Sequence, residues 1–135
     1  LMYKARTRFG NTVTEKNEFR ETVKTLNKDH RVVQLAADQR PNRRSTRYQR
    51  NFLNRPAYFF EGAEHIAKSM NLPVYFGEIS KLGRGRYQAT YELLSKGPYE
   101  SHPEHSITDA FCARLEANIH LQPDLYLWSH KRWRV

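Results

Sequence analysis

The stretch "RVVQLAA", at residues 31–37, constrains the fold of this chain more than any other feature of the sequence. It is short and almost continuously apolar, which is typical of a strand that is buried on both faces of a parallel sheet. Helical patterns at residues 16–29 and 57–71 stand on either side of it. The run therefore predicts a central strand in a sheet whose faces are covered by helices.

Strand and helix patterns continue to alternate along the chain. Further strands are predicted at residues 11–15, 72–80 and 86–94, and a further long helix at residues 106–122. The last two strands flank the turn "KLGRG", where Gly83 and Gly85 permit positive φ angles, so they predict a hairpin. We therefore expect an α/β fold, with a largely parallel sheet that contains one hairpin and is flanked by helices.

The first ten residues, "LMYKARTRFG", have the pattern of the last turns of a helix that Gly10 closes. A helix that ends so soon suggests that its beginning lies before residue 1. We therefore expect the N-terminal part of the fold to be missing. Residues 1–135 would then be the C-terminal lobe of a single domain.

The composition limits the choice of partners and cofactors. The chain carries 23 Lys and Arg against 14 Asp and Glu, a net charge of +9, which favours anionic partners. A single cysteine, Cys112, excludes an internal disulfide and a Cys-rich metal site, and its apolar neighbours predict a place in the core. The six His are scattered along the chain, so we expect no metal and no cofactor. No apolar run approaches the roughly 20 residues that a membrane-spanning helix needs.

An Arg-rich stretch, "DQRPNRRSTRYQRNFLNRP" at residues 38–56, follows the apolar run. Its arginines are Arg40, Arg43, Arg44, Arg47, Arg50 and Arg55. The planar guanidinium group binds phosphate and carboxylate through paired hydrogen bonds, so the stretch predicts a loop that binds an anion. The sequence leaves three sources of that anion open: a nucleic acid, a phosphorylated lipid or an acidic protein.

Several motifs occur together in one order. A strand ending in "ADQ" precedes the Arg-rich loop, and "NFLNRPAYFFEGAEHIAKSMNLPVYFGEI" and then "YLWSHKRW" follow it. In this order and spacing they resemble the lipid A biosynthesis acyltransferases of the lauroyl and myristoyl type, a branch of the lysophospholipid acyltransferase superfamily. The resemblance covers almost the whole chain.

The resemblance implies an activity and a location. Such enzymes move a fatty acyl chain from a thioester, often on acyl carrier protein, to a hydroxyl of a lipid A precursor or a lysolipid. They work at the cytoplasmic face of the bacterial inner membrane. We therefore expect an acyl thioester, an anionic lipid acceptor and the membrane surface as partners.

The catalytic motif of these enzymes is His-x4-Asp, in which the His is the general base and the Asp orients it. No His of this chain has an Asp five positions later; His105 with Asp109 and His120 with Asp124 are one residue short. The resemblance places the motif upstream, in the part expected to be missing, so we expect this chain to be inactive by itself. Asp38 matches the acidic position of a Glu-Gly-Thr-Arg block in related enzymes, and we expect it to support the site.

The remaining basic and aromatic residues divide into two expected groups. The substrate-binding group is Arg8, Gln39, Arg40, Arg43 and Arg44. The group expected to contact the membrane or the carrier protein is Arg47, Arg50, Arg55, Trp128, Lys131, Arg132 and Trp133. Cations beside amphipathic Trp side chains suit an anionic membrane interface.

Two other functions stay open on the sequence. Tyr48, Phe52 and Tyr58 lie among the arginines, as in proteins that stack bases and bind phosphates. The sequence has no helix-turn-helix, RNP or zinc-finger pattern, which favours lipid over nucleic acid. A non-catalytic interaction module that keeps the fold is the other alternative, because the catalytic motif is not in this chain.

Overall fold

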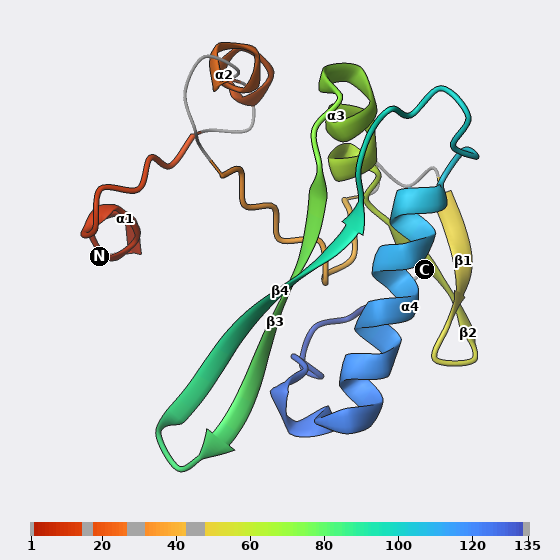
Figure 1. Cartoon of the computed structure of the whole chain (residues 1–135). Helices are drawn as coiled ribbons and strands as arrows, with labels where there is room; N and C mark the ends of the chain where they lie inside the picture. The colour runs from red at the N-terminus through yellow and green to blue at the C-terminus, as the bar shows by residue number, and fades with distance from the viewer. Residues whose placement is uncertain (1, 15–17, 27–31, 43–47, 134–135) are drawn as a thin grey trace. The chain divides into compact units, whose positions relative to one another are not determined.

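The structure is a computed structural model that describes residues 2–14, 18–26, 32–42 and 48–133. The chain divides into two compact units, Leu1–Leu35 and Ala36–Val135. The first unit contains two short helices, α1 (Met2–Thr7) and α2 (Phe19–Leu26) (Figure 1). The expectation that all 135 residues form one lobe of a single domain stays a prediction.

The second unit contains the candidate site and is built from two hairpins and two α-helices in its described part. Its elements are β1 (Tyr48–Phe52), β2 (Arg55–Phe59), α3 (Gly62–Met70), β3 (Val74–Gly83), β4 (Arg86–Ser95), α4 (Ser106–Leu121) and a 3-10 turn, η2 (Pro123–Leu125). β1 pairs antiparallel with β2, and β3 pairs antiparallel with β4. These are the two sheets that the described strands form.

The first hairpin turns at two residues that both have positive φ angles, Leu53 (50°) and Asn54 (60°). Two-residue turns of this hand match the twist of antiparallel strands, but a leucine is strained in this conformation. The carboxylate of Glu116 on α4 accepts a hydrogen bond from the backbone N–H of Leu53. The helix therefore holds the turn in a shape that the sequence of the turn does not itself favour.

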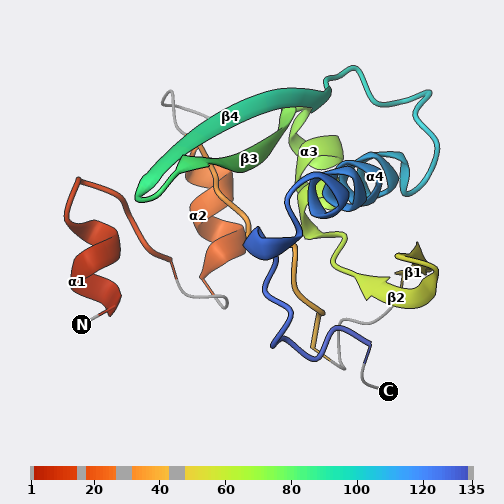
Figure 2. The ribbon, with the colours of Figure 1, turned by 90° about the horizontal axis from the view of Figure 1, so that it is seen from below.

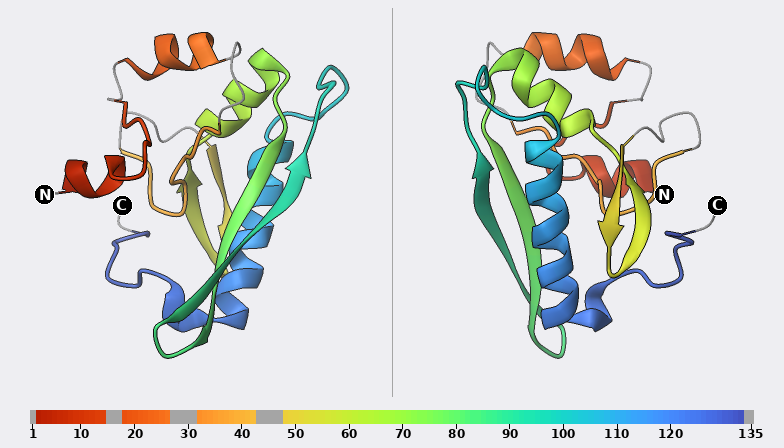
Figure 3. Two further views of the ribbon diagram at one scale, coloured as in Figure 1. Left: turned by 60° about the vertical axis from the view of Figure 1, so that its left-hand side comes forward. Right: turned by 90° about the vertical axis from the view of Figure 1, so that its right-hand side faces the viewer.

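Helix α4 lies between the two hairpins, as Figures 2 and 3 show from different directions. The buried core around it is Phe52, Ala57, Phe59, Phe76, Cys112, Leu115 and Ile119. Phe52 and Phe59 come from the first hairpin and meet edge to face, with ring centroids 5.2 Å apart. Phe76 comes from β3, so α4 joins both hairpins into one core. The prediction that Cys112 lies in the core is confirmed.

The predicted fold class is wrong, because the described sheets are antiparallel and two-stranded, not one largely parallel sheet. Residues 32–37, expected to form the central strand, have no regular secondary structure, and Val32 is 93% exposed. Residues 11–14 form no strand either. A strand needs a neighbour to satisfy its backbone N–H and C=O groups, and no described strand pairs with either run.

The helix predicted at residues 57–71 is shorter than expected, since Ala57–Phe59 belong to β2 and α3 begins at Gly62. Pro56 sits at a strand position, and Ala57 and Phe59 alternate inward with period two. The predicted hairpin and the last helix are confirmed as β3–β4 and α4. Asn71, the last residue of the helix predicted at residues 57–71, caps α3 in the left-handed conformation at φ 53°.

Candidate functional site

Two of the sequence motifs, 90 positions apart, lie side by side in the second unit. The backbone N–H of Arg40 donates to Nε2 of His130 at 2.9 Å. The hydroxyl of Tyr126 donates to the carbonyl of Asp38 at 3.4 Å. The segment Asp38–Arg40 therefore runs along the C-terminal tail, and we call this place, with Tyr126, His130 and Arg132, the Asp38 junction.

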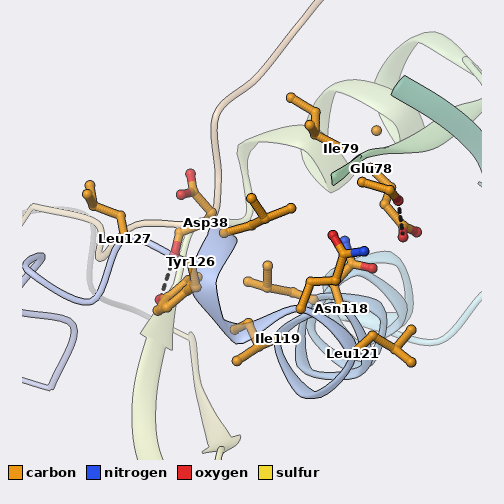
Figure 4. A pocket seen from close by; sticks show the side chains of 13 residues that line it. Asp38, Glu78, Ile79, Asn118, Ile119, Leu121, Tyr126 and Leu127 are labelled. Carbon is orange, nitrogen blue, oxygen red and sulfur yellow. Dashed lines mark hydrogen bonds between the residues drawn. The ribbon is translucent and has the colours of Figure 1, made fainter. Parts of the chain in front are cut away.

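A cavity of about 560 Å³ opens beside the junction (Figure 4). Asp38 and Tyr126 stand at one side of it, β3 supplies Ile79, and the end of α4 supplies Ile119 and further apolar groups. Its other apolar lining residues are Leu115, Leu121, Leu125 and Leu127. Its polar lining residues are Asp38, Glu78, Ser80, Asn118 and Gln122. Apolar surface combined with a small number of polar groups is the usual form of a site for a small molecule or a hydrocarbon chain.

The opposite wall of the cavity carries a carboxylate that is already paired. Glu78 Oε2 accepts from Nη2 of Arg114 at 2.8 Å. The amide of Asn118, with its nitrogen turned toward the carboxylate, donates to Glu78 Oε1 at 2.9 Å. The guanidinium of Arg114 and the amide of Asn118 therefore engage both oxygens of the Glu78 carboxylate.

Arg132 lies inside the core, although the sequence predicts it at the surface. It is 2% exposed, and its guanidinium carbon stands 4.1 Å from the ring centroid of Phe59 and 5.4 Å from that of Phe52. Its Nε, Nη1 and Nη2 atoms have no hydrogen-bond partner among the described residues. Burial lowers the pKa of the guanidinium, and the nearby Asp38 opposes that shift while Arg40 adds to it.

The sequence model of the bacterial lipid A biosynthesis acyltransferase family matches residues 1–135. The chain belongs to this family. The resemblance that its motifs carry is therefore confirmed, and full-length members of the family are acyltransferases. A search of curated proteins and a search of solved structures found no match.

In this acyltransferase family member, three of the expected contact residues are engaged in contacts within the chain. Arg50 on β1 bonds to Asp109, with Nη1 at 2.9 Å from Oδ1 and 2.8 Å from the carbonyl. Arg55 on β2 lies over the ring of Trp133, at 5.4 Å from its centroid. Trp133 in turn stacks against Phe52, with ring centroids 6.2 Å apart. These contacts give the three side chains a structural role within the chain, besides the role expected for them in contacting the membrane or the carrier protein.

Trp128 and Lys131 remain at the surface of the C-terminal tail. Trp128 is 53% exposed, and its indole N–H donates to the carbonyl of Pro123 at 2.7 Å. Lys131 is exposed. Both side chains are accessible to a membrane or a partner protein, in contrast to the buried Arg132.

The expected substrate-binding residues are only partly gathered. Asp38, Gln39 and Arg40 lie at the junction, with Gln39 exposed. Arg8 belongs to the first unit, where its guanidinium carbon lies 5.6 Å from the ring centroid of Phe9. Arg43 and Arg44 lie outside the described residues, as does Arg47 of the group expected to contact the membrane or the carrier protein.

A polar cluster that the sequence reading missed lies where β1 meets the start of α4. The Tyr48 hydroxyl donates to Asp109 Oδ1 at 2.5 Å, and burial together with this bond raises the pKa of Tyr48 to about 12. The His105 ring stacks on Tyr48 at 4.0 Å between centroids, and its Nδ1 lies 2.7 Å from Glu61 Oε1. The sequence "HPEH" at residues 102–105, with two His close together, was the available signal, but nothing in it points to Tyr48.

No group of three or more His, Cys, Asp or Glu able to hold a metal ion occurs among the residues that the structure describes. Within those residues, too, no helix combines the length and apolar character needed to cross a membrane.

Proposed function

We propose that this chain is part of an enzyme that moves a fatty acyl chain from acyl carrier protein, or another acyl thioester, to a hydroxyl of a lipid A precursor or a lysolipid. The observation that carries the proposal is the family match over residues 1–135. The apolar cavity beside Asp38 supports it, because a hydrocarbon chain needs an apolar site with polar groups at its end.

The chain supplies binding groups, and the chemical step needs a general base from elsewhere in the enzyme. A base must reach the acceptor hydroxyl, and in this family it belongs to a His-x4-Asp motif that these 135 residues do not contain. Asp38 and Arg40 are well placed for binding, because both stand at the junction beside the cavity. We therefore propose that the chain has no acyl transfer activity by itself.

The proposed location is the cytoplasmic face of the bacterial inner membrane, and one surface of the second unit supports it. Here the far end of the β3–β4 hairpin meets η2, because the backbone N–H of Lys81 donates to Gln122 Oε1 at 2.9 Å. Exposed apolar residues gather there, namely Ile79, Leu82, Leu121, Leu127 and Trp128. Lys81 and Arg84 are exposed cations at this end of the hairpin, where Lys81 Nζ lies 3.2 Å from Asp124 Oδ2, and Lys131 is exposed on the tail. Apolar side chains flanked by cations fit an anionic bilayer.

The proposal is tested by acyl transfer from a thioester of acyl carrier protein to a lipid acceptor. Three samples are compared: this chain, a longer product of the same gene that carries the His-x4-Asp motif, and the longer product with that His replaced by Ala. Transfer by the second sample only is the expected result. An inactive second sample with every donor and acceptor tried would overturn the proposed activity.

The role of the junction is tested in the longer product by replacing Asp38 with Asn. We expect kcat/KM to fall at least tenfold, because the change removes the charge of the one acidic group at the junction while keeping its size. Glu100→Gln, on an exposed residue of the β4–α4 loop, is the matched control and should retain full activity. Equal activity of the Asp38→Asn and Glu100→Gln variants would show that Asp38 does not belong to the site.

A further inference from the structure

The buried guanidinium of Arg132 is a donor group without an acceptor. A guanidinium has five N–H bonds and no acceptor atom, and all three of its nitrogens lack a hydrogen-bond partner among the described residues. Burying such a group unpaired is costly, because the charge loses its hydration and gains no bond in return. The aromatic faces of Phe59 and Phe52 recover part of that loss but satisfy no N–H.

A second unpaired donor lies next to it. The indole N–H of Trp133 is buried and has no acceptor among the described residues. Trp133 and Arg132 both contact the ring of Phe52, at 6.2 Å between ring centroids and 5.4 Å from the guanidinium carbon. Two neighbouring residues of the tail therefore offer hydrogen bonds that the described chain does not take up.

The charged groups near Arg132 carry a net positive charge, which an anion would balance. Asp38 and Arg40 both act electrostatically on its guanidinium, with opposite effects. Arg132 and Arg40 are positive and Asp38 is negative, and no hydrogen bond joins Asp38 to Arg132 among the described residues. His130 fixes the Arg40 backbone beside them. An anion with several acceptor oxygens would satisfy the guanidinium and balance the remaining charge.

The lining of the cavity beside the junction indicates which other chemical group is attached to that anion. Asp38 and Tyr126 line the cavity and also belong to the junction. Next to them the lining is apolar, with Leu115, Ile119 and Leu125, while the far wall carries the polar residues Glu78, Ser80, Asn118 and Gln122. A molecule that reaches Arg132 from this cavity would therefore combine an anionic head with a hydrocarbon part.

We propose that Arg132, together with Arg40, binds the phosphate of a phosphorylated lipid whose hydrocarbon part occupies the cavity beside Asp38. The inference rests on the proposed function for the choice of a lipid and adds the residues that bind its head group. Arginine suits this role because its planar fork matches two phosphate oxygens at once.

Access to Arg132 requires a movement of the chain, since the side chain is 2% exposed. We infer that the segment Asp38–Arg40 is the part that moves. It has no regular secondary structure, and the hydrogen bonds that tie it to the tail are Arg40 to His130 and the long 3.4 Å contact from Tyr126. Segments with few bonds of this kind open locally without unfolding the rest.

The test is an NMR titration of this chain with three probes: dodecyl phosphate below its micelle concentration, inorganic phosphate, and the neutral detergent dodecyl maltoside. Dodecyl phosphate should shift the Arg132 Nε–H, the Trp133 indole N–H and the amides of Leu125 and Ile119. Inorganic phosphate should shift the Arg132 and Trp133 signals only, and more weakly. A response to inorganic phosphate as strong as that to dodecyl phosphate would identify a site for free phosphate. No shift of the Arg132 signal with either phosphate would overturn the proposal.

Three variants make the test specific. Arg132→Met should weaken binding of dodecyl phosphate at least tenfold, because it removes the charge but keeps the volume against the two Phe rings. Arg40→Gln should also weaken it, and this variant leaves the core intact if Arg132→Met does not fold. Arg86→Gln, an exposed arginine on β4, is the matched control for charge and should bind as the parent chain does. Equal losses in all three variants would mean non-specific attraction to a basic protein and would overturn the proposal.

The titration needs no turnover, so the two proposals fail separately. If Arg132 binds phosphate but the longer product transfers no acyl group, the phosphate site is supported and the proposed activity is contradicted. If the longer product carrying Arg132→Met transfers acyl groups with the parent KM for the acceptor, the activity is supported and the phosphate site is contradicted.

Discussion

The backbone N–H of Arg40 donates to the imidazole Nε2 of His130 at 2.9 Å, across 90 positions of sequence. This bond uses the nitrogen that would otherwise be free for proton transfer, so His130 acts here as a structural acceptor. It also fixes the tautomer of the ring, with the proton on Nδ1. The bond explains how the end of the "ADQ" motif and the "WSHKRW" motif come to lie together.

Replacing His130 with Ala should release the Asp38–Arg40 segment from the tail. The lost hydrogen bond is worth about 1 kcal/mol, so hydrogen exchange of the Arg40 amide should become about fivefold faster. NMR-detected exchange measures this directly. His120→Ala, an exposed histidine near the end of α4, serves as the control and should leave the Arg40 amide unchanged. An Arg40 amide that exchanges equally fast in both variants would show that the bond contributes nothing to the junction.

Replacing Glu116 with Ala should destabilise the second unit through the turn at Leu53. The turn has positive φ angles at two non-glycine residues, and its first N–H loses its acceptor in this variant. We expect the free energy of unfolding in urea to fall by about 1–3 kcal/mol. Glu116→Gln keeps an acceptor oxygen and should lose less. The diagnostic result is a free energy of unfolding that rises from Glu116→Ala to Glu116→Gln to the parent chain. The reverse order would contradict the role given to Glu116.

Glu64 should make the stability depend on pH in the acidic range. It is 3% exposed and accepts from the Thr108 N–H at 2.9 Å and the Thr108 hydroxyl at 2.7 Å, while Lys68 Nζ lies 2.6 Å from its other oxygen. Burial by itself would raise the pKa of Glu64, but the bonds from Lys68 and Thr108 outweigh it, so the pKa is lowered from 4.5.

A lowered pKa in the folded state means that the carboxylate stabilises the fold above pH 4.5 and loses that effect as the pH falls through the folded-state pKa. The parent chain should therefore be more stable than Glu64→Gln at pH 7, and the difference should shrink steadily below pH 4.5. Urea unfolding at a series of pH values gives the difference. Glu104→Gln, whose side chain is 88% exposed, should follow the parent at every pH. A constant difference for Glu64→Gln would exclude this carboxylate as the cause.

Cys112 should resist thiol reagents while the second unit is folded. It is fully buried, and burial raises the pKa of its thiol to about 12, so the reactive thiolate is scarce at neutral pH. The rate of alkylation by iodoacetamide should rise by several orders of magnitude when urea unfolds the chain. Rapid alkylation without urea would mean that α4 opens readily in the native state.

The sequence predicts the local elements of the second unit better than their assembly. The strand pattern at residues 86–94 and the helical pattern at residues 106–122 are encoded locally, and both elements are present as β4 and α4. The residue before α4 is His105 in the left-handed conformation, and no side chain caps the helix there. The run at residues 31–37 is different, because burial on two faces depends on neighbouring strands that the run itself does not encode. Its apolar character indicated a strand but could not supply the partner.

The first hairpin shows why residues 48–60 were misread. Its turn has no glycine, and Leu53 at positive φ depends on Glu116, which lies 63 positions later. The paired aromatics Phe59 and Phe60 fit a helical stripe as well as a strand, so periodicity alone could not decide between them. The alternation of Tyr48, Arg50 and Phe52 was the signal that could have shown a strand.

The motifs of the sequence singled out Asp38 and Arg40 but not their neighbours. Both residues were expected at the edge of a parallel sheet, and the bond from the Arg40 N–H to His130 places them beside the tail instead. Arg132 was placed at the surface because an arginine among cations and tryptophans is normally solvated. Its position between Phe59 and Phe52 depends on the first hairpin, which the sequence did not reveal.

The place of α4 between the hairpins has a consequence for how the second unit comes apart. No described strand of one hairpin pairs with a strand of the other, so the two are joined through the apolar face of the helix. Loosening either hairpin uncovers Cys112, Leu115 or Ile119 and thereby weakens the support of its counterpart. We therefore expect the two small sheets to unfold as a single cooperative element, with loosening of the first hairpin transmitted through α4 to the wall of the cavity.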